Sequence, residues 1–150
     1  MNDLKVRKSI EIDASPEVVF KAISDPSELT NWFPEAVILE PVVGGKTKFT
    51  FSKDSKRTIC VRDHDKFNEG KVLEFVKNKK LVYTWQDMDV PDFPETTVVW
   101  ELEELSKNKT RVTLTHTGFT SNDQVKGHYE GWSFFLGELV TYCKKNREGN

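Results

Sequence analysis

The sequence predicts an α+β protein in which a curved antiparallel sheet is closed by a long C-terminal helix. Three observations carry this prediction. Residues 36–119 alternate between apolar and polar side chains, as half-buried strands do. Residues 15–33 have the signals of two short helices, and the stretch after residue 121 has one broad apolar arc at helical spacing. Strands gathered in one run beside an amphipathic helix are typical of a sheet covered by that helix.

The N-terminal part begins with a strand and continues with a helix pair. Residues 6–12 alternate, with apolar side chains in one phase. Ser15 is then placed as an N-cap with Pro16 at the first helical position. A second helix is predicted to start at Asp25 in capping-box spacing and to end at Pro34. The two short helices therefore lie between the first and second strands.

Turn signals divide the middle of the chain into strands that hairpins would connect. Inward phases are clear in "KFTF", "LVYTW", "TTVVWEL" and "RVTLTHTG", and they are strongly aromatic. The opposite phases carry Lys, Thr, Glu and Arg, as on the solvated side of an antiparallel sheet. The expected turns lie at Gly44-Gly45, Asp54-Ser55, Asn68 to Gly70, Asn78 to Lys80, Pro91 to Pro94 and Ser106 to Lys109.

The last helix is predicted to be the longest and to bury one face. At about 100° per residue its apolar arc must face the sheet. Three glycines interrupt it, each less favourable than alanine in a helix by about 1 kcal/mol. They would either allow close approach of the helix backbone to the sheet edge or to something held beneath, or relieve crowding beside the aromatic rings. The arc comprises His128, Trp132, Phe135, Leu136, Leu139, Val140 and Cys143, and the glycines are Gly127, Gly131 and Gly137.

Composition narrows the class of protein. The 150 residues suit one domain, 1–150, and a formal charge of -2 provides no bulk attraction to nucleic acid or to an anionic membrane. No apolar run approaches the ~20 residues that span a bilayer, so we expect a cytoplasmic protein, without a membrane or nucleic-acid partner. Cys60 and Cys143 stand far apart and are expected to be buried free thiols. We expect neither a metal nor another cofactor.

Three segments together resemble the activator-of-heat-shock-protein-90-ATPase homologue group of START-like (SRPBCC) domains. They are "VVFKAISDPSELTNWF", "TVVWELEEL" with "TRVTLTHTGF", and "GHYEGWSFFLGELVTY". The resemblance implies a helix-grip fold, in which sheet and long helix enclose an apolar cavity that in many relatives holds a hydrophobic molecule. The residues predicted to line it are Trp32, Phe49, Phe51, Tyr83, Trp85, Trp100, His116, His128, Trp132, Phe135, Leu136 and Leu139.

Polar residues that fall in the apolar phase of a predicted strand or helix are the candidates for ligand binding or catalysis. His116 and His128 are expected to meet inside or at the mouth of the cavity, where they would orient a ligand or would serve only as structural histidines. The segment "RDHD", residues 62–65, fits a solvated turn better than a metal site. The segment at residues 87–95 would lid the cavity, meet a partner or simply connect two strands.

Three functions remain open from the sequence. The leading one is non-catalytic binding of a lipid-like or aromatic, polyketide-like molecule by a monomer. The second is a chaperone-linked interaction protein of the stress response, with Phe134 and residues 87–95 as the surface to test. The third is a cavity enzyme that would use His116 and His128, the only candidates for an acid or a base, although no nucleophile motif is present.

Overall fold

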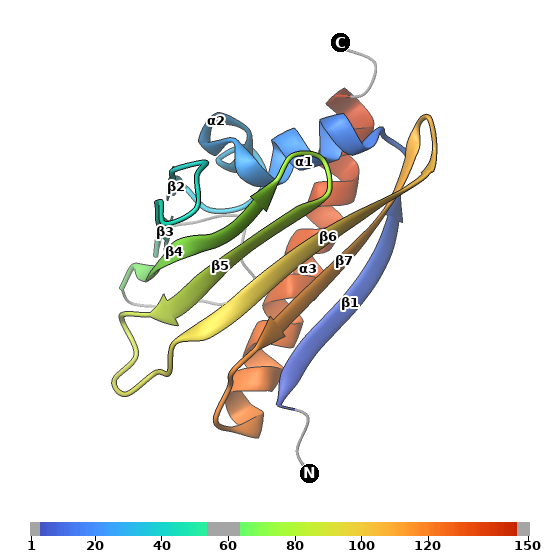
Figure 1. The fold of residues 1–150 in the computed structure, drawn as a ribbon. Helices are drawn as coiled ribbons and strands as arrows, with labels where there is room; N and C mark the ends of the chain where they lie inside the picture. Colours follow the sequence, from blue (N-terminus) through green and yellow to red (C-terminus); the bar gives the residue numbers. More distant parts are fainter. Residues whose placement is uncertain (1–3, 54–63, 147–150) are drawn as a thin grey trace.

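The computed structural model describes residues 4–53 and 64–146, and its centre is one antiparallel sheet with the strand order β1-β7-β6-β5-β4-β3-β2. The sheet is curved, and the long helix α3 runs along one of its faces (Figure 1). The elements are β1 (Lys5–Ile12), α1 (Pro16–Ser24), α2 (Pro26–Leu29), β2 (Ala36–Leu39), β3 (Lys46–Phe51), β4 (Lys66–Val76), β5 (Lys80–Asp87), β6 (Thr96–Ser106), β7 (Lys109–Thr117) and α3 (Asn122–Asn146).

This architecture confirms the predicted fold class: a curved sheet, two short helices after the first strand and a long C-terminal helix. The predicted arc of α3 is the face turned to the core, where Trp132, Leu136, Leu139 and Cys143 are buried. Alternation also holds in β7, whose inward phase is buried while its outward phase is half-buried. The core therefore lies between the sheet and α3.

The helix pair forms for the reasons that the sequence indicates. The Ser15 side chain accepts a hydrogen bond from the backbone N–H of Val18, and Pro16 opens α1. The Asp25 carboxylate likewise accepts from the N–H of Ser27 at the start of α2. The predicted end of the second helix at Pro34 is wrong, because α2 is one turn long and ends at Leu29. Irregular turns carry the chain from there to β2.

The predicted turn from Asn68 to Gly70 is also wrong, because both residues lie inside the 11-residue strand β4. Gly70 is required by close approach rather than by a turn. A Cβ atom there would overlap the backbone carbonyl of Thr84 on β5. The Thr84 hydroxyl accepts a hydrogen bond from the N–H of Lys71, which binds the two strands at this tight point.

The three glycines of α3 do not serve close packing. A Cβ atom added to Gly127, Gly131 or Gly137 would meet no atom within 4 Å outside its own helix surroundings. Neither predicted role, close approach to the sheet or relief of crowding beside the rings, is therefore borne out. The glycines instead leave α3 intrinsically weaker than its length suggests.

Two glycine substitutions test whether Gly70 is required by the close approach of β4 and β5 and whether Gly137 is free of packing contacts. Gly137→Ala should stabilise the protein by about 1 kcal/mol, because the helix gains propensity and the methyl group enters open space. Gly70→Ala should destabilise it by about 1–3 kcal/mol, because the methyl group forces β4 and β5 apart. Urea unfolding monitored by tryptophan fluorescence measures both changes. Equal effects of the two substitutions would contradict the assignments.

Candidate functional site

An aromatic layer fills the space between α3 and the sheet, and Phe33 lies at its centre. The Phe33 ring is 4.9–6.3 Å, centroid to centroid, from five other rings on β3, β5 and α3. Such offset and edge-to-face contacts stabilise beyond the apolar area that they bury. The aromatic layer consists of Phe33 with Phe49, Phe51, Trp85, Trp132 and Phe135.

The structure brings the predicted cavity residues together. Eleven of the twelve are buried, and His128 is half-buried. Trp100 lies against Trp132 and donates a hydrogen bond to the Tyr83 hydroxyl at 3.0 Å, while Trp32 donates to the backbone carbonyl of Ala22 at 2.9 Å. Burial raises the pKa of Tyr83 far above its ordinary value, more than the Trp100 hydrogen bond lowers it. Whether these residues contact a ligand stays a prediction.

His116 joins helix and sheet through a buried chain of hydrogen bonds. The Trp132 indole N–H on α3 donates to His116 Nδ1 at 3.0 Å. His116 Nε2 lies 2.7 Å from the Thr96 hydroxyl oxygen, and that hydroxyl donates to the backbone carbonyl of Trp85. Because Nδ1 accepts and the Thr96 proton is used elsewhere, the ring is neutral with its proton on Nε2.

Asp87 collects a second set of polar side chains at the edge of the aromatic layer. Its carboxylate is 1% exposed and accepts from Trp85 Nε1 at 2.9 Å. Its other oxygen lies 3.1 Å from Lys66 Nζ and 3.1 Å from His128 Nε2. His128 Nδ1 is 2.8 Å from the backbone carbonyl of Gln124, so both ring nitrogens of His128 face acceptors. We call Lys66, Asp87 and His128 the polar cluster.

The electrostatics of the site keep His116 neutral and Asp87 ionised. Burial lowers the pKa of His116 well below 6.5, and nearby His128 lowers it further against the opposing effect of Asp87. Burial alone would raise the pKa of Asp87. The hydrogen bond from His128 and the charge of Lys66 outweigh burial, so the Asp87 pKa lies below its ordinary value.

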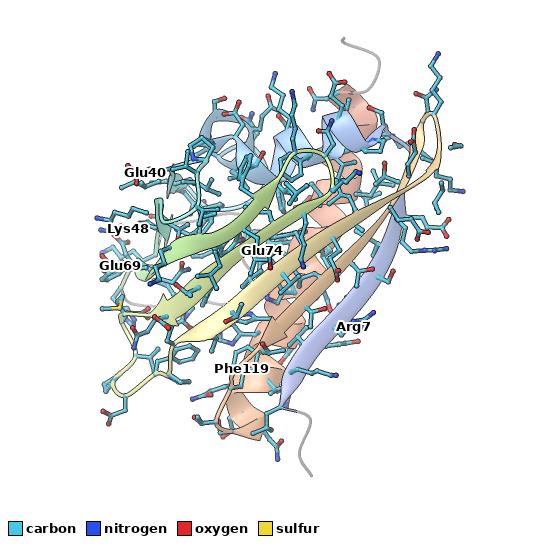
Figure 2. The ribbon with its side chains drawn as sticks, viewed as in Figure 1. Arg7, Glu40, Lys48, Glu69, Glu74 and Phe119 are labelled. Carbon is cyan, nitrogen blue, oxygen red and sulfur yellow. The ribbon has the colours of Figure 1, made fainter. Side chains whose placement is uncertain are left out.

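The two histidines meet, as predicted, with ring centroids 5.3 Å apart. Phe119, just past the end of β7 (Figure 2), and Phe93 lie against the His128 ring at 4.9 and 5.5 Å. All four ring nitrogens of His116 and His128 have hydrogen-bond partners. A ligand can form a hydrogen bond with either ring only by displacing one of these partners. The same displacement is needed before either ring can act as a base.

Part of the segment at residues 87–95 is buried in the protein interior, and part is exposed to solvent. Phe93 is buried against His128, and its backbone carbonyl accepts from Gln86 Nε2 at 2.9 Å. Met88 and Val90 are exposed. This segment therefore covers the end of the aromatic layer that carries the polar cluster. Phe134, predicted to face outward, is half-buried and packs against the neighbouring Phe135 ring.

Sequence reasoning missed Phe33, Lys66 and Thr96 as parts of the site and read Asp87 only as part of a loop. The inward phase of β5, Leu81, Tyr83 and Trp85, reaches Asp87 at the next step and was a usable signal. Phe33 carries no such signal, because it lies in the irregular turn after α2. Thr96 was in the predicted inward phase of β6, but its hydroxyl partner could not be inferred from one strand.

The remaining candidates do not form a second reactive centre. Among residues 4–53 and 64–146, no group of His, Cys, Asp or Glu is arranged to hold a metal ion. His64 lies 3.2 Å from Asp89, whereas Arg62, Asp63 and Cys60 fall outside the described residues. Cys143 is a buried free thiol, as predicted, and burial together with Glu28 raises its pKa to about 12. That thiol is unreactive at neutral pH.

Two surface hollows lie away from the aromatic layer. One, of about 150 Å³, is lined by Trp32 and Tyr142 near the end of α3. The other, of about 520 Å³, lies between α1 and the turn joining β4 and β5, with Phe20 and Phe75 in its wall. Of the predicted cavity residues, only Trp32 lines either hollow.

The sheet that grips a long C-terminal helix defines a helix-grip fold, and comparison with known proteins gives the family. The family model described as "Activator of Hsp90 ATPase homolog 1-like protein" matches residues 13–144. The chain belongs to this family. No curated protein matches it. Within the described part of the chain, no helix has both the length and the apolar character needed to cross a membrane.

Solved structures share the fold. The Aha1 dimer from Colwellia psychrerythraea is 25% identical with a TM-score of 0.69, covering 91% of this chain and 92% of that one. An Hsp90 activator from Plasmodium falciparum is 24% identical with a TM-score of 0.71, covering 91% and 94%. DynU16, from the dynemicin biosynthetic locus, is 22% identical with a TM-score of 0.79, covering 97% of this chain and 49% of that one. The monomeric state of this protein stays a prediction.

The neutral state of His116 predicts a pH dependence of stability. Because the unfolded ring binds a proton below pH 6.5 and the folded ring does not, acidification stabilises the unfolded state. From pH 7.5 to 5.5 this group should lower the free energy of unfolding by about 1.4 kcal/mol. Urea unfolding at both pH values should show that His116→Gln loses this part of the pH dependence.

The same prediction can be checked without a variant. Nitrogen-15 NMR of the ring should find His116 neutral at pH 5.5, with its proton on Nε2. A doubly protonated ring at pH 5.5, or an unchanged pH dependence in His116→Gln, would contradict the proposed hydrogen-bond chain.

Proposed function

We propose that the protein binds a hydrophobic small molecule between the sheet and α3. Sites for such molecules are lined mostly by apolar and aromatic side chains, with a few polar groups that fix orientation. The aromatic layer would supply the apolar contacts, together with Tyr83, Trp100, Leu136 and Leu139 around it. The observation that carries the proposal is the polar cluster buried at the edge of this layer.

The polar cluster is costly for a protein that needs only a stable core. Removing charges from water costs several kcal/mol per ion, and well-packed apolar residues often replace a buried ion pair without loss of stability. Lys66 and His128 nevertheless keep 27% and 14% of their side chains exposed, so the cluster lies where solvent and the interior meet. This is the position expected of groups that receive the polar end of a ligand.

Entry of a ligand requires α3 and the aromatic layer to move, since the rings now contact one another. The glycines of α3 favour such movement, because each weakens the helix and none is needed for packing. Residues 87–95 would act as the lid that the sequence suggested, with Phe93 as the group that leaves the interior first. A ligand that replaces Phe93 against His128 would regain the contacts that are lost.

The chaperone-linked alternative has weaker support. It draws on the family name and on relatives described as Aha1 and as an Hsp90 activator. Of the surface considered for it, Met88 and Val90 are exposed, whereas Phe134, Asp87 and Phe93 are not. Capture of purified host Hsp90 by the wild-type protein but not by Met88→Ser, with no small-molecule binding, would favour this alternative.

Binding should depend on the inner face of α3 and not on its outer face. For any of oleate, flavone or 2-naphthamide that binds, Phe135→Trp should lower affinity at least tenfold, because the larger ring occupies the ligand's space. Tyr129→Trp is the matched control, since Tyr129 is exposed on the same helix, and its affinity should equal that of the wild type.

Isothermal titration calorimetry measures these affinities, and circular dichroism checks that both variants fold. The proposal fails if none of the three probes binds the wild-type protein. It also fails if Phe135→Trp and Tyr129→Trp bind equally well.

A further inference from the structure

Asn68 is a buried polar residue whose side chain is left without a role in the fold. It lies in β4 opposite Phe49 on β3 and Asp87 on β5, and it is 1% exposed. Its cross-strand partner Phe49 belongs to the aromatic layer, so the amide lies on the inner face of the sheet. Lys48 and Glu69, the adjacent pair, carry the outer face (Figure 2). Neither the amide oxygen nor the amide nitrogen has a hydrogen-bond partner among the described residues.

An unsatisfied buried amide costs about 1–3 kcal/mol per group, so its presence calls for an explanation. The carboxylate of Asp87, the cross-strand neighbour of Asn68 on β5, is directed to Trp85, Lys66 and His128 instead. Asn68 is therefore the cross-strand neighbour of a member of the polar cluster but forms no hydrogen bond with the cluster.

A second free polar group lies beside Asn68. Thr47 on β3 is fully buried, and its hydroxyl also has no partner within the described part of the chain. Thr47 is paired with Gly70, two residues from Asn68, so the two side chains are diagonal neighbours on the inner face. Two unused polar side chains thus share one patch under the aromatic layer.

We propose that Asn68 recognises the polar end of the ligand and that this end is a neutral amide or lactam. A primary amide presents one acceptor and one donor side by side, and a ligand amide pairs with both at once. The end must be neutral, because a carboxylate only accepts and an ammonium only donates, so neither pairs with both unpartnered atoms of the Asn68 amide. This inference rests on the proposed function and assigns the site a ligand class and a specificity residue.

Substitution of Asn68 by leucine, which is similar in size, tests the proposal through a matched series of probes. The series is 2-naphthamide, with donor and acceptor; 2-acetonaphthone, with an acceptor only; and 2-methylnaphthalene, with neither. Asn68→Leu should bind 2-naphthamide at least tenfold more weakly than the wild type does. It should bind 2-methylnaphthalene as tightly as the wild type or more tightly, and 2-acetonaphthone should fall between. The melting temperature should rise, because two unsatisfied polar atoms leave the core.

Each outcome separates this inference from the function on which it rests. If the wild type binds the probes and Asn68→Leu weakens all three equally, or none of them, Asn68 is not the recognition residue while the binding function stands. If the wild type binds none of the three, this inference fails, whereas the proposed function still stands if oleate or flavone binds. Should Asn68→Leu not fold, Asn68→Ala removes the same amide with a smaller side chain. It should then weaken 2-naphthamide relative to 2-methylnaphthalene by at least twofold, and an unchanged ratio would overturn the proposal.

Discussion

The contact between α3 and the sheet is the interaction on which the rest of the structure depends. The aromatic layer provides its area, and hydrogen bonds fix the position of the helix along the sheet. Trp132 donates to His116 on β7, His128 reaches Asp87 at the end of β5, and Lys8 on β1 donates to Ser133 at 2.8 Å. These hydrogen bonds join α3 to three strands of the sheet. They hold α3 in register even though its glycines weaken it as a helix.

The buried polar groups between the sheet and α3 are of two kinds. His116, Thr96 and the Trp132 indole form a closed chain in which each group has a partner, and such chains specify one arrangement of the core. Asn68 and Thr47 lie on the same inner face without partners among the residues that the structure describes. Unsatisfied buried groups reduce stability, and a ligand that pairs with the Asn68 amide, as proposed above, would recover part of this cost.

The fold could be predicted from the sequence because periodicity determines which faces are buried. The arc of α3 and the inward phases of β5, β6 and β7 were readable, and so was the encounter of His116 with His128. The errors arose where a residue type has two uses. Asn68 and Gly70 read as turn residues, yet one supplies a buried amide and the other avoids the Thr84 carbonyl. Both uses depend on the neighbouring strand, which local sequence does not reveal.

The polar cluster was beyond sequence reasoning for the same reason. Lys66 begins β4, Asp87 ends β5 and His128 lies on α3, and only the register and the curvature of the sheet bring them within 3.1 Å contacts. Lys66 was assigned no role from the sequence, and Asp87 was placed only in the segment at residues 87–95. Only the position of Trp85, one inward step before Asp87, indicated that the strand continues inward to the carboxylate.

The measurement that tests the central claim most directly is a proton–nitrogen NMR titration of the tryptophan indole groups with 2-naphthamide. Trp85 and Trp132 donate to Asp87 and His116, so their indole signals report on the interior between sheet and helix. If a ligand enters there, both signals should shift and saturate together. Shifts confined to residues on the outer face of the sheet, with both indole signals unmoved at saturating probe, would contradict the account.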